Sequence, residues 1–303
     1  MTPNKLPNLN ETVIAALDFF EKNQPARLNL KNLGFPLVVG SGNAFNTGQI
    51  IFSDKPAIIA NESNFKKIIT NYKPLIRKKI ITQAVIISAS GEKDSIWEIK
   101  LAKKNGLKTI LLTCSPQSTA AQLADQTIVY QKLPEPYTYN VSTYLGMILA
   151  GKNEKALGIK KFINTLKLPK DFKKYTAYSF ILPDEFGAIA PMLEIKRHEL
   201  FGPYLSLRAF SFGEARHAKF VNNSAKELVI SFGENKYFGL KKNRLEIKLP
   251  KNAGFGLIFA LSYYLIGKIQ EIKPPYFKKN IASYCQEAPQ AYGHKKAFAI
   301  IVE

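Results

Sequence analysis

Short, uninterrupted runs of aliphatic residues recur through the first half of the chain. The five runs are PLVVG (36–40), PAIIA (56–60), AVIIS (84–88), TILLT (109–113) and TIVYQ (126–130). Runs of this length without polar alternation are typical of strands buried on both faces, as in a parallel sheet. Over residues 94–105, Ile96, Ile99 and Ala102 recur at helical spacing, and Gly106 is a C-terminal stop signal. Strands alternating with helices predict a doubly wound α/β domain.

The second half of the chain repeats this alternation less regularly. Apolar runs predict strands at TAYSFIL (176–182), SLRAFSF (206–212) and ELVISF (227–232), and an alternating run predicts an edge strand at RLEIKL (244–249). Helical spacing of apolar residues predicts helices at 10–22, 187–202 and 254–270. The last of these is strongly apolar but short for a membrane span, so we expect a core helix there.

These patterns predict an α/β fold of two tandem doubly wound, flavodoxin-like domains, each with a parallel sheet flanked by helices. We expect a helical lead at 1–30, a first domain at 31–150, a second at 151–290 and a C-terminal tail at 291–303. The stretch near 151–174, which carries lysines and glycines, is the expected link between the two halves.

Composition narrows the class of protein. The 303 residues are 46% hydrophobic and 12% aromatic, enough to bury sizeable cores. The N-terminal MTPNKLP lacks the apolar centre of a signal peptide, and no apolar run is long enough to cross a bilayer. Cys114 and Cys285 lie far apart, and no His/Cys/Asp/Glu cluster has the spacing of a zinc site. We therefore expect a cytoplasmic protein with no metal and no cofactor.

The charge is strongly positive: 43 Lys and Arg against 23 Asp and Glu give a formal net charge of +20. The basic residues come as scattered pairs, without an arginine-rich arm or a zinc-finger spacing. This distribution favours a solvated lysine-rich surface over a nucleic-acid-binding stripe. Neither a nucleic acid nor a membrane is an expected partner.

Two loops at the ends of predicted strands combine glycine with serine. In ISASGEKDSIWEI (87–99), Ser88, Ser90 and Gly91 separate a strand from a helix, and Ser41 and Gly42 follow the first strand. Ligands of open parallel sheets lie beyond the carboxyl ends of the strands, where helix N-termini offer unpaired N–H groups to phosphate. A single such loop is equally well explained as a helix cap and a turn. The pair favours an anion site.

At these positions the chain resembles a known family. Ser88-Ala89-Ser90-Gly91-Glu92 is similar to the S-x-S-G-E loop of sugar isomerase (SIS) domains, which bind phosphosugars. Further segments with the same order in tandem SIS enzymes are GSGNAF (40–45), TCSPQSTAAQLAD (113–125), YNVSTYLGMIL (139–149), EIKRHELFG (194–202) and FGEARHAKF (212–220). Those enzymes include the isomerase portion of glucosamine-6-phosphate synthase and its deaminase relatives.

The resemblance implies a role for each matching residue. Ser88, Ser90 and Ser41, with the backbone near Gly42 and Gly91, would hold the phosphate. The resemblance further implies that Ser142 and Thr143 line the sugar pocket.

For catalysis, the resemblance implies that Glu199 shuttles a proton between C1 and C2, and that His217 opens the sugar ring in a neighbouring subunit of a homodimer. These residue types suit the chemistry, because one carboxylate can act as base and then as acid, and histidine titrates near neutral pH. A glutamate on a helix can instead simply pair with a lysine such as Lys196. The expected activity is that of a phosphosugar aldose–ketose isomerase or an amino-sugar-phosphate deaminase.

Several positions depart from the family pattern. Lys93 stands where the loop usually has a threonine on the phosphate, and Ala218 follows His217 where glycine is usual. Phe298 lies about where the synthase has its functional lysine, which leaves Lys295 or Lys296 as substitutes. Lys93 and the tail keep a non-catalytic phosphosugar sensor open as an alternative. A phosphoglucose/phosphomannose isomerase is the other alternative, because a short, two-domain chain fits it.

Overall fold

The computed structural model describes residues 6–30, 33–218, 223–293 and 296–303. The chain forms two compact units. The five-stranded unit consists of Phe19–Leu133 and Ser142–Lys155. The four-stranded unit consists of Met1–Asp18, Pro134–Val141 and Ala156–Glu303. The domain bounds derived from the sequence stay a prediction.

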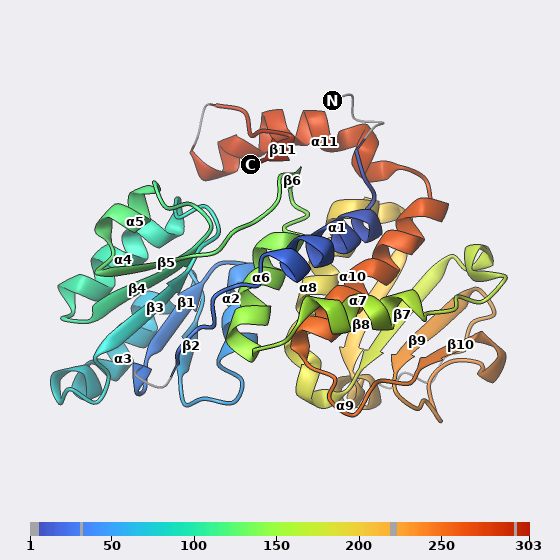
Figure 1. The fold of residues 1–303 in the computed structure, drawn as a ribbon, viewed down its shortest axis with the longest axis horizontal. Coiled ribbons are helices and arrows are strands. Elements are labelled where there is room, and N and C mark those ends of the chain that lie inside the picture. Colours follow the sequence, from blue (N-terminus) through green and yellow to red (C-terminus); the bar gives the residue numbers. More distant parts are fainter. Residues whose placement is uncertain (1–5, 31–32, 219–222, 294–295) are drawn as a thin grey trace. The chain divides into compact units, whose positions relative to one another are not determined.

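The sheet of the five-stranded unit is entirely parallel, in the order β2-β1-β3-β4-β5 (Figure 1). This is the flavodoxin-like order, in which the first strand lies between the second and the third. The strands coincide with the five aliphatic runs: β1 (Leu37–Gly40), β2 (Ile58–Ala60), β3 (Gln83–Ile87), β4 (Lys108–Thr113) and β5 (Gln126–Val129). Because β1 pairs directly with β3, the loops that follow these two strands begin at the same edge of the sheet.

Helices of the five-stranded unit place their apolar positions against this sheet. Leu37, Ile86 and Leu111 of the strands form one buried cluster with Ile99 and Ala102 of a helix, two of the three positions whose spacing predicted it. The helices are α2 (Asn43–Ile51), α3 (Phe65–Arg77), α4 (Asp94–Lys104), α5 (Thr119–Leu123) and α6 (Val141–Lys152), whose first residue belongs to the other unit.

The sheet of the four-stranded unit is also parallel, in the order β10-β9-β7-β8. With β7 as its first strand, this is the same pattern without a fifth strand. The strands are β7 (Ala177–Leu182), β8 (Ser206–Ser211), β9 (Glu227–Phe232) and β10 (Arg244–Ile247). β10 is the edge strand that the alternating run predicted. The α/β class with two parallel, helix-flanked sheets is therefore confirmed.

The helices of the four-stranded unit include the apolar helix at its centre. They are α1 (Leu9–Lys22, which continues into the other unit), α7 (Ala156–Asn164), α8 (Ala190–Phe201), α9 (Phe212–His217), α10 (Phe255–Ile272) and α11 (Tyr276–Glu287). A short 3-10 helix, η4 (Asp184–Ile189), precedes α8. The expected link near 151–174 contains α7, because Ala156, Ile159 and Ile163 are buried at helical spacing.

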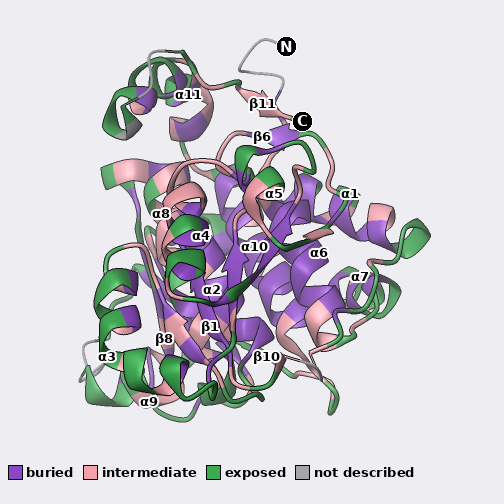
Figure 2. Cartoon of the chain, turned by 90° about the vertical axis from the view of Figure 1, so that its left-hand side faces the viewer, coloured by how far each residue is buried: buried purple, intermediate pink, exposed green. Residues whose placement is uncertain are grey.

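α10 is the one helix in the described ranges with the length and hydropathy of a membrane span, and 72% of it is buried within the structure. Figure 2 shows it in the colour of buried residues over most of its length. A Cβ at Gly267 would lie 1.9 Å from the backbone nitrogen of Asn10, so glycine is required where α1 crosses α10. This burial is that of a core helix.

A two-stranded antiparallel sheet holds the C-terminal residues of the four-stranded unit. β11 (Ile301–Val302) pairs with β6 (Glu135–Pro136). Phe298, just before β11, stacks on Tyr137 with ring centroids 5.0 Å apart.

Candidate functional site

The serine side chains of the loop after β3 form hydrogen bonds with the backbone of the same loop. The hydroxyl oxygen of Ser88 accepts the N–H of Gly91 (3.2 Å), and that of Ser90 accepts the N–H of Glu92 (3.3 Å). Ser88 is half-buried and Ser90 is exposed. An oxygen that accepts a bond can still donate its own proton. Both hydroxyls therefore shape the loop and remain able to donate to an anion.

Gly91 is required by packing within the protein. Its φ is +62°, and a Cβ there would lie 2.0 Å from the Ser118 hydroxyl oxygen. Its carbonyl accepts the N–H of Ala120 (3.0 Å), while the carboxylate of Glu92 accepts the N–H of Thr119 (2.8 Å). These two hydrogen bonds hold the loop against the start of α5. Because Gly91 has no Cβ, the side chain of Ser118 can pack directly against it.

The loop after β1 is joined to the start of α4. The hydroxyl of Ser41 donates to the carboxylate of Asp94 (3.2 Å). Gly42 precedes α2 with φ 54° and ψ −123°. The structure therefore brings together the two glycine-and-serine loops that the sequence singled out, as expected from strands that are neighbours in the sheet.

Lys93 adopts the backbone conformation that glycine takes in the other loop. It precedes α4 with φ 58° and ψ −123°, nearly the angles of Gly42 before α2. A residue with a Cβ is strained there by about 1–3 kcal/mol. Burial lowers the pKa of its ammonium, and the charge of Asp94 opposes that shift. The lysine thus occupies a strained, partly buried position at the end of the serine loop.

Sequence reasoning missed an acidic group beside these loops. Glu98 of α4 is only 1% exposed, and one of its carboxyl oxygens has no hydrogen-bond partner among the described residues. Burial raises its pKa to about 8, reinforced by the negative charges of Asp94 and Glu62. The signal was available in part, since Glu98 shares the buried stripe of α4 with Ser95, Ile99 and Ala102.

Ser142 and Thr143 lie in the first turn of α6 and are buried, 0% and 3% exposed. The hydroxyl oxygen of Ser142 accepts the N–H of Leu133 (2.9 Å). Ser142 therefore fixes the segment that leads from β5 to α6. Whether either residue contacts a sugar stays a prediction.

In the four-stranded unit, Glu199 of α8 pairs with Lys196 at 2.5 Å. Lys196 is completely buried; its ammonium also donates to the Thr138 carbonyl and lies 5.6 Å from the ring centroid of Tyr263. Burial raises the pKa of Glu199, and the ammonium of Lys196 opposes this shift. The lysine partner that the sequence offered as an alternative explanation is present. Lys196 is fully buried, while the side chain of Glu199 is 23% exposed.

His217 is the last residue of the short helix α9 and is exposed. Ser211 and Glu214 form a reciprocal capping box at the start of this helix, which fixes its position after β8. Lys296 is exposed, while Lys295 and His294 lie outside the described residues. In the described part of the chain, no group of three or more His, Cys, Asp and Glu side chains could hold a metal ion.

The segment that contains the serine loop matches a known protein family. Residues 66–150 match the family model of the SIS domain. No curated protein matches the sequence.

Similar solved structures cover most of the chain. Glucosamine-6-phosphate deaminase from Thermotoga maritima has a TM-score of 0.58 at 17% identity, over 87% of this chain and 92% of that chain. The C-terminal domain of glucosamine-fructose-6-phosphate aminotransferase from Francisella tularensis has a TM-score of 0.58 at 13% identity, over 87% and 94%. Tagatose-6-phosphate ketose/aldose isomerase from Escherichia coli has a TM-score of 0.56 at 14% identity, over 88% and 89%. These likenesses concern the fold. Residues 66–150 are an SIS domain, as the resemblance of the serine loop predicted.

Proposed function

We propose that this SIS-domain chain is a phosphosugar aldose–ketose isomerase or an amino-sugar-phosphate deaminase. Both reactions begin with transfer of a proton between adjacent carbons through an enediol-type intermediate. The observation that carries the proposal is the carboxylate of Glu199, which is paired at 2.5 Å with the fully buried ammonium of Lys196. The SIS match and the similar structures of sugar-phosphate enzymes support the same class. In this proposal the chain is a cytoplasmic enzyme that works without a cofactor.

The phosphate would be held by Ser88, Ser90 and Ser41, with Lys93 in place of the usual threonine. The serine hydroxyls of the loop already accept backbone N–H groups, so their protons are available to phosphate oxygens. Hydrogen bonds to a charged group contribute roughly 1.5–3 kcal/mol each, so a few donors suffice to anchor the substrate. Ser142 and Thr143 would line the sugar pocket.

Glu199 would remove a proton from one carbon and return it to the next. A group that does both works best with a pKa near the operating pH, and its burial acts in that direction. Lys196 would be a positioning residue, because its hydrogen bond to Glu199 restrains the carboxylate. The ammonium also balances the negative charge of the ionised form.

The reaction is tested by deuterium exchange. The chain is incubated in deuterated water with a panel of hexose and hexosamine 6-phosphates, and solvent deuterium at C1 or C2 is followed by NMR. We expect exchange with at least one member of the panel, whatever the final product. Absence of exchange across the whole panel would contradict the proposal.

One observation favours a non-catalytic phosphosugar sensor as the second candidate. The hydroxyl of Ser41 is already engaged with the carboxylate of Asp94, and that negative charge stands beside the proposed phosphate loop. Binding of a phosphosugar without any deuterium exchange would support this candidate. A phosphoglucose or phosphomannose isomerase would instead exchange only with the corresponding hexose 6-phosphates.

We further propose that His217 opens the sugar ring and completes the site of a second subunit in a homodimer. Its exposure at the end of α9 is compatible with contact to another subunit. The test mixes an inactive Glu199 variant with inactive His217→Ala under conditions of proven subunit exchange. Partial recovery of activity is expected. No recovery would mean that the two residues act within one subunit.

A further inference from the structure

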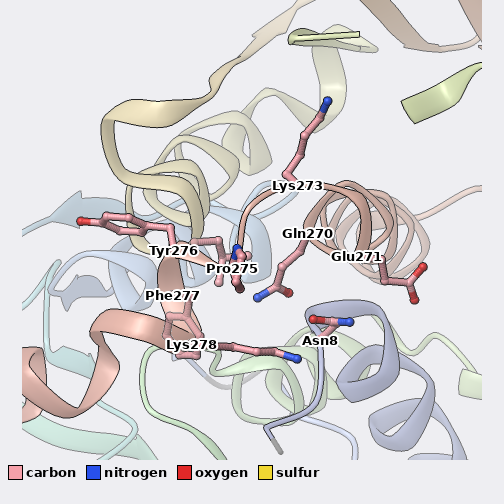
Figure 3. Close-up of a pocket in the computed structure, with 9 residues that line it drawn as sticks. Asn8, Gln270, Glu271, Lys273, Pro275, Tyr276, Phe277 and Lys278 are labelled. Carbon is pink, nitrogen blue, oxygen red and sulfur yellow. The ribbon is translucent and has the colours of Figure 1, made fainter. Parts of the chain in front are cut away.

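A cavity of about 260 Å³ lies within the four-stranded unit, formed by residues that the proposed reaction does not use. Its walls come from the segment before α1, the last turn of α10, the first turn of α11 and Leu200 of α8 (Figure 3). Ligand pockets of proteins usually measure about 300–1,000 Å³. The cavity lies just below this range, so it has room only for a small ligand.

Two polar side chains at this cavity have no partner of their own. Neither the ammonium of Lys278 nor the side-chain amide of Asn8 makes an ion pair or a hydrogen bond within the ranges that the structure describes. In Figure 3 both extend toward the same space as the amide of Gln270. A cation and an amide that converge without partners are suited to an anion.

The other charged residues of the lining are engaged elsewhere. Glu271 accepts a hydrogen bond from Asn10 (2.6 Å) and pairs with Lys268 (2.5 Å). The ammonium of Lys273 donates to the carbonyls of Tyr175 and Lys173. Figure 3 shows the side chains of Glu271 and Lys273 extending away from the space between Lys278 and Asn8. The charge available inside the cavity is therefore the single positive charge of Lys278.

Hydrogen bonds and ring packing hold the remaining wall in place. The amide of Gln270 accepts the N–H of Leu9 (2.8 Å) and donates to the Tyr139 hydroxyl (3.0 Å), so its orientation is fixed. The ring of Phe277 packs on Tyr139 with centroids 4.9 Å apart. A preformed wall reduces the entropy that a ligand loses on binding.

We propose that this cavity binds a small organic anion, a metabolite that carries a carboxylate or a phosphate. The anionic group contacts Lys278 and Asn8, and the rest of the ligand packs on Pro275 and Phe277. The net charge of +20 raises the local concentration of anions around the chain and favours occupancy. No residue of the phosphate loop lines this cavity.

The test follows backbone amides of the isotope-labelled full chain by NMR during titration with inorganic phosphate and, separately, with succinate. Saturable shifts at Asn8, Phe277 and Lys278 support the site. A response to phosphate alone assigns it to phosphorylated ligands, and a response to succinate alone assigns it to carboxylates. Shifts confined to Ser88–Lys93, or no shift with either probe at tens of millimolar, would overturn the inference.

A pair of neighbouring lysines supplies the matched control. Lys278→Ala and Lys279→Ala remove the same charge from the same turn of α11, but only Lys278 lines the cavity. We expect Lys278→Ala to weaken binding at this site at least about tenfold, the loss of one hydrogen bond to a charged group. Lys279→Ala should weaken it less than about twofold, because an exposed charge is screened. Equal losses would attribute the binding to general charge and overturn the site.

Discussion

The candidate functional groups of the two units lie in different environments. In the five-stranded unit, the loops after β1 and β3 are polar and partly exposed, and their shape depends on backbone N–H groups and glycines. In the four-stranded unit, Glu199 is held by a lysine that is completely buried. The loops can lose a hydroxyl without burying an unpaired charge. Loss of Glu199, by contrast, would leave the buried ammonium of Lys196 without its partner carboxylate.

This difference affects how substitutions are interpreted. Removing one partner of a buried ion pair leaves an uncompensated charge, which is strongly destabilising whatever the partner does in catalysis. Loss of activity in a Glu199 variant is therefore ambiguous on its own. The experiments below separate the structural from the chemical role, beginning with the largest expected effect.

The largest effect is expected at Glu199. Glu199→Gln removes the negative charge that balances buried Lys196, and it should lower the free energy of unfolding by about 3 kcal/mol. The double variant Lys196→Met/Glu199→Gln removes both charges. Its free energy of unfolding should therefore lie within about 1 kcal/mol of the wild-type value. Chemical denaturation measures both values.

The double variant also separates catalysis from stability. Compared with Lys196→Met alone, it differs only at Glu199, and its deuterium exchange should be at least about a hundredfold slower. Equal exchange in these two variants would show that Glu199 is not the base. An unchanged stability in Glu199→Gln would show that Lys196 does not need its partner.

The next effect concerns Glu98, the buried carboxyl of the five-stranded unit. Its pKa of about 8 lies above its ordinary value, so the folded state keeps a proton that the unfolded state releases from about pH 4.5 upward. Stability should therefore fall as the pH rises from about 4.5 to about 8. Glu98→Gln lacks this titration and should be the more stable form, by up to about 4 kcal/mol at pH 8.

The measurement for Glu98 is the difference in unfolding free energy between Glu98→Gln and the wild type across this pH range. Glu62→Gln is the control: it removes one charge that raises the pKa of Glu98, and it should shift the fall to lower pH values. A difference that does not change with pH would mean that Glu98 is ionised in the folded protein.

The smallest effect is expected at Lys93, where stability and binding should change in opposite directions. Lys93 has a positive φ, which strains a residue with a Cβ but not a glycine such as Gly42 in the equivalent loop. Lys93→Gly should therefore raise the free energy of unfolding by about 1 kcal/mol. The same change removes the charge proposed to hold phosphate, so phosphosugar affinity should fall by about tenfold.

Lys100→Ala is the control for Lys93, since it removes an exposed charge from α4, the helix that Lys93 precedes. It should change neither quantity by a comparable amount. If Lys93→Gly binds phosphosugar as tightly as the wild type, the lysine does not replace the threonine of related loops.

The sequence determined the elements and their class. Uninterrupted aliphatic runs predicted all five strands of the first sheet, because strands covered on both faces need no polar alternation. This burial holds for β1, β3 and β4, whereas β5 at the edge of the sheet is only partly buried. The spacing of Ile96, Ile99 and Ala102 predicted α4. The serine and glycine positions identified two loops that follow neighbouring strands of the sheet. These features are local, so neighbouring residues suffice to specify them.

Only the tertiary structure decided the environment of each ionisable group. Asp94 accepting from Ser41, Glu98 enclosed with Glu62 nearby, and Lys196 buried against Thr138 and Tyr263 all depend on residues distant in the sequence. The cavity beside Lys278 likewise combines Asn8 with residues more than two hundred positions away. Burial and charge proximity set a pKa and the strength of an ion pair, and neither can be inferred from spacing along the chain.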